Sequence, residues 1–85
     1  MTSLAYNVNS AGEVWTYHEE GGGELLSPAG VRFAQDIGVG KDGSVWVITN
    51  EARPGGFAPA WLQDPAAKKW VTLAAPAAVT DVSVL

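Results

Sequence analysis

The chain has 85 residues, a net charge of −4 and no cysteine, which allows one small domain and excludes a disulfide framework and a cysteine-based metal site. The single histidine excludes a histidine-rich metal site, and the five scattered basic residues argue against a nucleic-acid-binding face, so we expect no cofactor and no nucleic-acid partner. No apolar run is long enough to span a bilayer, and residues 1–10 do not resemble a signal peptide. We therefore expect no membrane insertion, and either a cytoplasmic location or export without a classical leader.

Short strands separated by turn residues are predicted along the whole chain. The turns carry Gly, Pro, Asp and Ser, the residues that favour tight turns. The predicted strands are residues 3–9, 13–18, 24–27, 35–39, 44–50, 59–63, 69–74 and 79–85. The sequence therefore predicts an all-β fold.

The stretch GVGKDG, residues 38–43, has the spacing G-x-G-x-x-G of a phosphate-binding turn. Such a turn works only where a helix follows, because the helix N-terminus holds the phosphate. Here SVWVITN follows, a run of strand-forming residues. Asp42-Gly43 is instead a hairpin-turn pair, so we predict a β-hairpin and no nucleotide site.

Residues 66–75, AAKKWVTLAA, have helical propensity and are the one ambiguous element. Their counterpart in the repeat described next, GGGELLSPAG, begins with three glycines, contains a proline and is incompatible with a helix. Because both copies of a repeat adopt one structure, we predict a strand.

An internal repeat of about 45 residues divides the chain into two copies. The segment from Val14 aligns with the segment from Ala60, so that Trp15 falls on Trp61, Leu25 on Trp70 and QDIGV on TDVSV. Upstream, TSLAYNVN aligns with DGSVWVITN. Repeat 1 covers residues 3–34, repeat 2 covers residues 35–78, and residues 79–85 are the inner strand that completes the split blade of a neighbouring subunit.

Four short strands per repeat of this length are typical of β-propeller blades. One blade, residues 35–74, is complete, and the other is split between the two ends of the chain. Because a propeller needs about four to eight blades, we expect residues 79–85 of one subunit to pair with residues 3–9 of the next. A homotrimer would give a six-bladed ring, and assembly would also add stability to a domain whose core is small.

The order DIGVGKDGSVWVIT, AWLQDPAAKKWVTL, AAVTDVSV resembles the tectonin repeat, and the resemblance covers nearly the whole chain in two copies. It implies a β-propeller, commonly six-bladed, and a lectin that binds glycans, including O-methylated or deoxy sugars. The first copy departs from the family pattern, with Leu25 in place of the fourth-strand Trp and Ala5 where the second copy has Trp46.

The segment 50–60, NEARPGGFAPA, is longer than its counterpart NSAGEV and is predicted to be an inserted loop. Binding residues are often found on such loops. Asn50, Glu51 and Arg53 are candidates for hydrogen bonds to sugar hydroxyls, and Phe57 is a candidate apolar wall. The alternative is a variable surface loop without a role.

Four aromatic residues complete the candidate ligand contacts. Trp15 and Trp61 share the third strand of the two repeats, where stacking on a pyranose and plain packing are both open. Tyr17 lies on the same strand as Trp15. Trp46 is also a candidate, although burial between blades is favoured for it and for Trp70.

The other residues considered are interpreted as structural or solvent-exposed and not as ligand contacts. Asp36 and Asp81 head the inner strands, where backbone capping is favoured over ligand contact. Gly38 and Ser83 are small residues suited to a crowded axis. His18, with Glu19 and Glu20, is predicted to lie in a solvated loop before the glycine run.

The hypothesis that follows is a multivalent carbohydrate-binding lectin and not an enzyme. A structural or protein-interaction propeller, with the same aromatics used only for packing, is the first alternative. A lyase-type propeller is the second, although no His/carboxylate pair recurs in the two copies.

Overall fold

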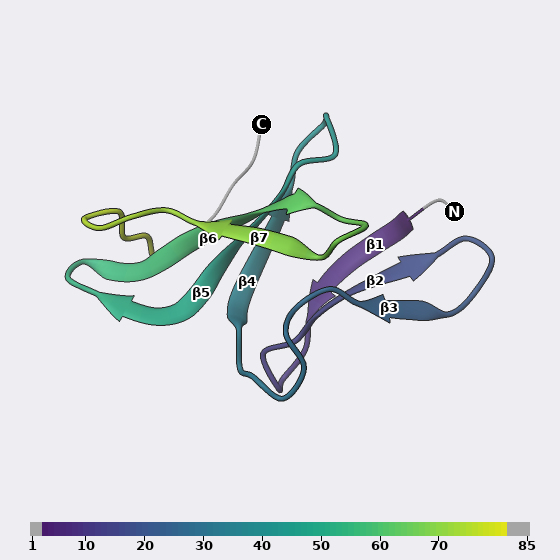
Figure 1. Cartoon of the computed structure of the whole chain (residues 1–85), viewed down its shortest axis with the longest axis horizontal. Helices are drawn as coiled ribbons and strands as arrows, with labels where there is room; N and C mark the ends of the chain where they lie inside the picture. Colours follow the sequence, from purple (N-terminus) through teal and green to yellow (C-terminus); the bar gives the residue numbers. More distant parts are fainter. Residues whose placement is uncertain (1–2, 82–85) are drawn as a thin grey trace.

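The computed structural model describes residues 3–81 and contains two antiparallel β-sheets and no helix in that range (Figure 1). The three-stranded sheet has the order β1-β2-β3 and the four-stranded sheet the order β4-β5-β6-β7. The strands are β1 (Ser3–Val8), β2 (Val14–His18), β3 (Gly23–Leu25), β4 (Ala34–Val39), β5 (Val45–Arg53), β6 (Gly56–Asp64) and β7 (Lys69–Thr72). The predicted all-β fold is therefore confirmed, and within each sheet the strands lie in sequence order.

The GVGKDG stretch is the tip of the β4–β5 hairpin, as predicted. The Gly40 N–H donates to the Ser44 carbonyl at 2.8 Å, and the Asp42 carboxylate accepts from the Ser44 N–H at 3.0 Å. Gly43 has φ +86°, a conformation that favours glycine. The backbone N–H groups of this turn are thus used inside the hairpin.

Residues 66–75 contain strand β7, which confirms strand over helix. The turn before it is fixed by Asp64, whose carboxylate accepts from the N–H groups of Ala66 and Ala67 at 3.1 and 3.3 Å. β7 then pairs with β6, with Trp61 opposite Val71 and Leu62 opposite Trp70.

The prediction of a loop over residues 50–60 is wrong. β5 continues to Arg53 and β6 begins at Gly56, so a tight turn joins two nine-residue strands. A bulge between Ile48 and Ala52 interrupts the pairing, and the Thr49 hydroxyl stabilises it by donating to the Ala58 carbonyl at 2.7 Å and accepting from the Glu51 N–H at 3.2 Å. Pro54-Gly55 supplies the turn, and the other added residues therefore lengthen the ladder.

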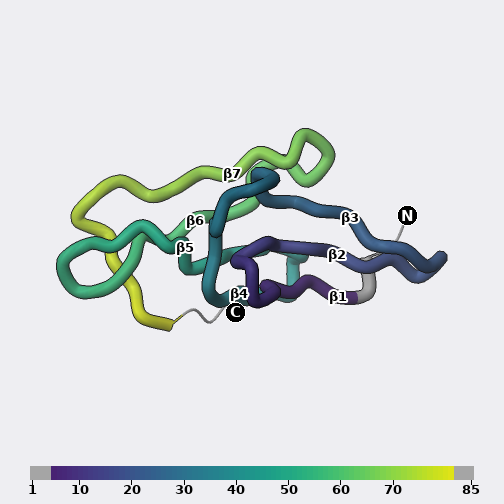
Figure 2. Tube along the Cα trace, turned by 90° about the horizontal axis from the view of Figure 1, so that it is seen from below, coloured from purple at the N-terminus to yellow at the C-terminus, as the bar shows by residue number. Residues whose placement is uncertain are grey.

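The two sheets bury a common core between their facing surfaces, which we call the inner faces (Figure 2). These residues are apolar and nearly inaccessible to solvent: Val14, Leu26, Ala34, Val45, Val47, Ala60 and Leu62. Trp70 packs against this core, stacks at a tilt on Phe33 with ring centroids 5.2 Å apart, and donates from its indole nitrogen to the Leu26 carbonyl at 3.0 Å. Trp70 is therefore a packing residue, as favoured from the sequence.

Different backbone hydrogen bonds hold the two crossovers by which the chain leaves the sheets. In the first crossover, residues 26–34, the N–H groups of Phe33 and Ala34 donate to the Gly12 carbonyl at 2.9 and 3.0 Å. In the second crossover, residues 73–79, Val79 and Phe57 exchange two backbone hydrogen bonds of 2.8 and 2.9 Å. The inner strand predicted at residues 79–85, with Ser83, lies outside the described residues beyond position 81.

The strand registers refine the repeat. Leu25 lies opposite Trp15, whereas Trp70 lies opposite Leu62, so the two aligned residues are not equivalent in the sheets. Ala5 lies opposite Tyr17, whereas Trp46 lies opposite Trp61. The bulge in β5 explains the second difference, because it shifts the pairing on one side of the long hairpin.

Candidate binding cleft

A pocket of about 220 Å³ opens beside the first crossover, at the ends of β5 and β7; we call it the crossover pocket. Its lining combines charged, amide and hydroxyl side chains with two apolar ones: Val31, Arg32, Phe33, Thr49, Asn50, Glu51 and Thr72. Pockets that bind small molecules typically have such a mixture, with an apolar wall and a few convergent polar groups.

Strand pairing explains why these residues meet. Ala34 lies opposite Thr49 in the β4–β5 ladder, so the residues before 34 run beside those after 49. The Asn50 N–H donates to the Phe33 carbonyl at 3.1 Å, and the Asn50 side-chain amide donates to the Arg32 carbonyl at 3.2 Å. The Asn50 backbone is thereby fixed, and its exposed amide carries a carbonyl oxygen that can accept from a ligand.

Arg32 supplies the positive charge of the pocket. Its aliphatic part lies over Gly12, where an added Cβ would come within 2.6 Å of the Arg32 Cγ. Gly12 also has φ +77°, so the turn before β2 requires glycine both for its backbone and for the space above it. The guanidinium itself belongs to an exposed residue.

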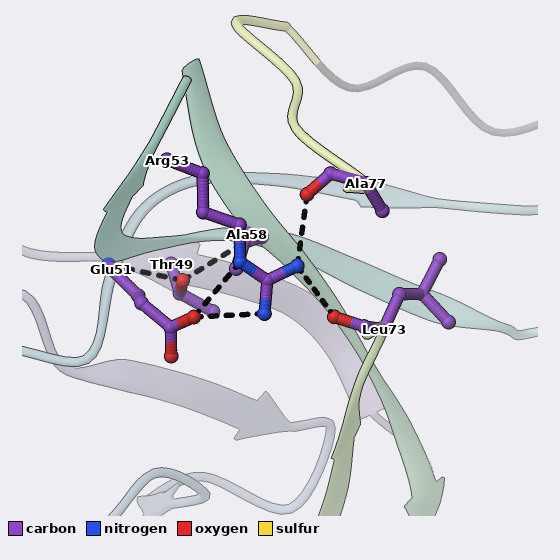
Figure 3. A network of polar contacts seen from close by, with 6 residues as sticks. All are labelled: Thr49, Glu51, Arg53, Ala58, Leu73 and Ala77. Carbon is purple, nitrogen blue, oxygen red and sulfur yellow. Dashed lines mark hydrogen bonds and ion pairs between the residues drawn. The ribbon is translucent and has the colours of Figure 1, made fainter. Parts of the chain in front are cut away.

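Glu51 and Arg53 form an ion pair at the edge of this region (Figure 3). The Arg53 Nε and Nη2 lie 2.9 and 2.8 Å from the Glu51 Oε2. The Arg53 Nη1 donates to the carbonyls of Leu73 and Ala77 at 2.7 and 2.9 Å. Three of its nitrogens are thus engaged within the fold, and only 13% of the side chain is exposed.

These contacts give different roles to Arg53 and Glu51, which were both predicted to bind sugar. Arg53 holds the second crossover against the β5–β6 hairpin, and it lines neither the crossover pocket nor an open surface. Glu51 lines the pocket with a side chain that is 59% exposed, and Arg53 contacts only one of its two carboxylate oxygens. Glu51 can therefore accept a hydrogen bond from a ligand while Arg53 keeps its carboxylate in place.

Phe57, Trp46 and Trp61 lie away from the crossover pocket. Phe57 is half-buried and bridges to Val79. Trp46 and Trp61 are cross-strand neighbours whose rings stack with centroids 6.1 Å apart and an interplanar angle of 29°. They point away from the inner face that carries Val47 and Ala60, so we call their side the outer face of the four-stranded sheet.

Trp15 and Tyr17 lie on the outer face of the three-stranded sheet, since they alternate with the core-facing Val14 and Thr16. The Trp15 indole nitrogen donates to the Glu13 Oε1 at 3.2 Å, and Asn9 donates to the same oxygen at 2.8 Å. The hydrogen bond from Asn9, with that from Trp15 second, lowers the pKa of the Glu13 carboxyl. Tyr17 is 42% exposed.

The remaining polar predictions have mixed outcomes. Asp36 accepts from the adjacent Ile37 N–H at 2.9 Å, as backbone capping predicts, and Asp81 also has interactions within the structure. Glu19 and Glu20 are exposed turn residues as expected. The assignment of His18 to a solvated loop is wrong, because His18 ends β2 with a side chain only 10% exposed. Strand alternation on Val14 and Thr16 continues to position 18 and places it on the inner face.

Five lining residues of the crossover pocket were not singled out from the sequence: Val31, Arg32, Phe33, Thr49 and Thr72. The signal for Arg32 and Phe33 was available. A hairpin with its tip at residues 41–43 places residue 34 opposite residue 49, so Arg32 and Phe33 must pass Asn50 and Glu51. Thr72 gives no comparable signal, because its position depends on the register of β7.

No protein-family profile matches the chain, and no match was found among the curated proteins or the solved structures. Within residues 3–81, no group of three or more His, Cys, Asp or Glu side chains is placed to hold a metal ion. The same part of the chain contains no helix of the length and apolarity needed to cross a membrane.

Proposed function

We propose that the chain is a subunit of a multivalent, carbohydrate-binding β-propeller. The crossover pocket is the observation that carries the binding function. Arg32 donates, Glu51 and the Asn50 carbonyl accept, and Val31 with Phe33 provides an apolar wall. Planar polar groups beside an apolar surface suit a sugar ring, which has hydroxyls at its edge and C–H groups on its faces.

The resemblance to tectonin repeats supports the same ligand class. The apolar wall formed by Val31 and Phe33 suits a methyl group or a deoxy position on the sugar, because such a group gains from contact with apolar surface and needs no hydrogen-bond partner. Methylated or deoxy sugars are therefore the preferred ligands of the proposed site.

The strand orders of the two sheets support the proposed ring. The four-stranded sheet has the strand order of a complete propeller blade, and the three-stranded sheet lacks a counterpart of β4. The second crossover begins like the first, which leads into β4, and residues 80–84, TDVSV, align with QDIGV of β4. We propose that this segment pairs with β1 of the next subunit, which gives a six-bladed homotrimer by threefold closure.

The outer faces support the same assembly. Trp46 and Trp61 on one sheet, and Trp15 and Tyr17 on the other, are large aromatic side chains that remain partly exposed in a single chain. In the ring, the outer face of the four-stranded sheet packs on the outer face of the next subunit's three-stranded sheet, as the inner faces pack within one chain. Three copies of each site on a rigid ring then bind a glycan surface by avidity.

A glycan array that includes O-methylated and deoxy sugars tests the binding function. We expect binding by the wild-type protein, and a Kd raised about tenfold or more by Arg32→Met, which keeps the aliphatic cover of Gly12 but removes the donor. Glu20→Gln, an exposed change in a turn, is the control and leaves binding unchanged. Absence of binding to every glycan at high protein density would leave the structural or protein-interaction propeller as the function.

A further inference from the structure

A second pocket of about 220 Å³ lies between the inner face of the three-stranded sheet and the turn that joins β6 to β7, and we call it the histidine pocket. Polar side chains of the three-stranded sheet face apolar residues there: Tyr6, Thr16, His18, Glu24, Leu26 and Pro65. None of these residues lines the crossover pocket. Trp70 contacts the lining of both pockets, since it bonds to Leu26 of one and stacks on Phe33 of the other.

His18 is the unusual residue of this pocket. Its side chain is nine-tenths buried, and neither ring nitrogen has a hydrogen-bond partner among the described residues. Leaving a buried polar atom unsatisfied is unfavourable, so such atoms are rare unless they serve a purpose. The position of His18 on the pocket lining places its imidazole where a bound molecule can satisfy it.

Glu24 provides the second polar group and indicates the chemistry of the ligand. Its Oε1 lies 3.9 Å from the His18 Nε2, which is too long for a direct hydrogen bond. A hydroxyl group that bridges them accepts from the imidazole Nε2–H and donates to the carboxylate, and so satisfies one ring nitrogen of His18 and one oxygen of Glu24. The carboxylate disfavours an anion, and Lys68, 3.7 Å from the Glu24 Oε2, disfavours a cation.

We propose that the histidine pocket is a binding site for a neutral hydroxylated molecule no larger than a monosaccharide. Its volume lies below the roughly 300 Å³ at which pockets for drug-sized ligands begin, which limits the ligand to about one sugar ring. Leu26 and Pro65 offer an apolar wall for the C–H groups of such a ring, opposite His18 and Glu24. This site is separate from the crossover pocket and would give each chain two sites.

His18 is the only histidine of the chain, so the imidazole signals report on the surroundings of this one residue. The full-length protein, labelled with ¹⁵N, is titrated with methyl α-D-mannopyranoside, methyl β-D-galactopyranoside, methyl α-L-fucopyranoside and glycerol, and the imidazole ¹H–¹⁵N shifts are recorded. We expect a saturable shift with at least one of the glycosides. Glu24→Gln is expected to raise the Kd for that probe about tenfold or more, because it removes a charge-assisted acceptor.

Two control variants separate this site from the proposed function. Glu20→Gln, an exposed change near His18, leaves the titration unchanged, and Arg32→Met weakens binding on the glycan array but leaves the His18 titration unchanged. The proposal is overturned if no probe gives a saturable shift, if Glu24→Gln leaves the Kd unchanged, or if Arg32→Met abolishes the shift. An unshifted His18 together with binding on the array would overturn the histidine pocket and leave the crossover pocket standing.

Discussion

The two sheets are copies of one repeat, yet they solve the same structural problem differently. Each must hold the crossover that leads the chain away from it. The three-stranded sheet does so with a short turn, in which the Gly12 carbonyl accepts from two N–H groups of the first crossover. The four-stranded sheet has a longer hairpin, and Arg53 on that hairpin binds two carbonyls of the second crossover.

The difference teaches what the added residues of the second copy are for. An insertion between two strands suggests a binding loop, but here it becomes a strand extension with a clamping side chain. The clamp fixes the direction in which residues 79–81 leave the sheet, and we propose that this direction delivers the following strand to the next subunit. The first copy needs no clamp because β4 follows its crossover and packs in the same core.

The largest expected effect comes from deleting residues 82–85, which leaves the Val79–Phe57 bridge in place. In the proposed ring, this change removes the strand that covers β1 of the neighbouring subunit and leaves a bare sheet edge. We expect a monomeric or aggregated chain by light scattering. A truncated protein that keeps the mass of the full chain would show that the strand exchange is wrong.

Arg53→Ala sharpens the comparison between the two crossovers. It leaves the carbonyls of Leu73 and Ala77 without their donor and the Glu51 carboxylate without its partner. We expect a loss of about 2–4 kcal/mol in the free energy of unfolding, measured by denaturant titration. The control, Arg32→Ala, removes the arginine that lies at the first crossover and should cost less than about 1 kcal/mol of unfolding free energy. An equal cost for the two variants would contradict the proposal that Arg53 clamps the second crossover.

Trp70→Phe tests the contact that joins the two sheets. The phenyl ring fills most of the indole volume but cannot donate to the Leu26 carbonyl. We expect a loss of about 1–2 kcal/mol in the free energy of unfolding. The control is Trp61→Phe on the outer face of the same sheet. A larger loss of unfolding free energy for Trp61→Phe than for Trp70→Phe would contradict the assignment of the main packing contact to the inner face.

The smallest expected effect is that of Glu13→Gln on the pH dependence of stability. The lowered pKa of the Glu13 carboxyl means that the folded state holds the ionised form more strongly than the unfolded chain does, so the contribution is complete above the ordinary value of 4.5 and is lost as the pH falls through the lowered value. We expect Glu13→Gln to reduce the difference in unfolding midpoint between neutral and acidic solution. Glu19→Gln, an exposed change in a turn, should leave that difference unaltered.

Much of the fold could be predicted from the sequence because its signals are local. Asp42-Gly43 between two strand-forming runs indicated the hairpin, and the glycines of the aligned copy excluded a helix over residues 66–75. The registers could not be predicted in the same way. Ala5 and Trp46 align in sequence but face different partners, Tyr17 and Trp61, because of the bulge in β5, which is decided by contacts such as the Thr49 hydroxyl with the Ala58 carbonyl.

The candidate sites were harder to predict than the strands. Asn50 and Glu51 were found because they lie beside a visible insertion, whereas Arg32 is brought to them only by the pairing of β4 and β5. His18 was misplaced because the acidic and glycine residues after it resemble a flexible loop, although strand alternation continued to position 18. Arg53 was expected to face a ligand, but its guanidinium donates to backbone carbonyls 20 and 24 residues further along the chain. No local sequence pattern indicates such contacts.

The mass of the protein in solution tests the proposed assembly most directly. A homotrimer of the 8.9 kDa chain has a mass of about 27 kDa, which light scattering coupled to size-exclusion chromatography resolves from other states. We expect about 27 kDa at micromolar concentration. Masses near 18 or 36 kDa would keep the propeller and change its blade count, whereas a folded protein of about 9 kDa would contradict the ring.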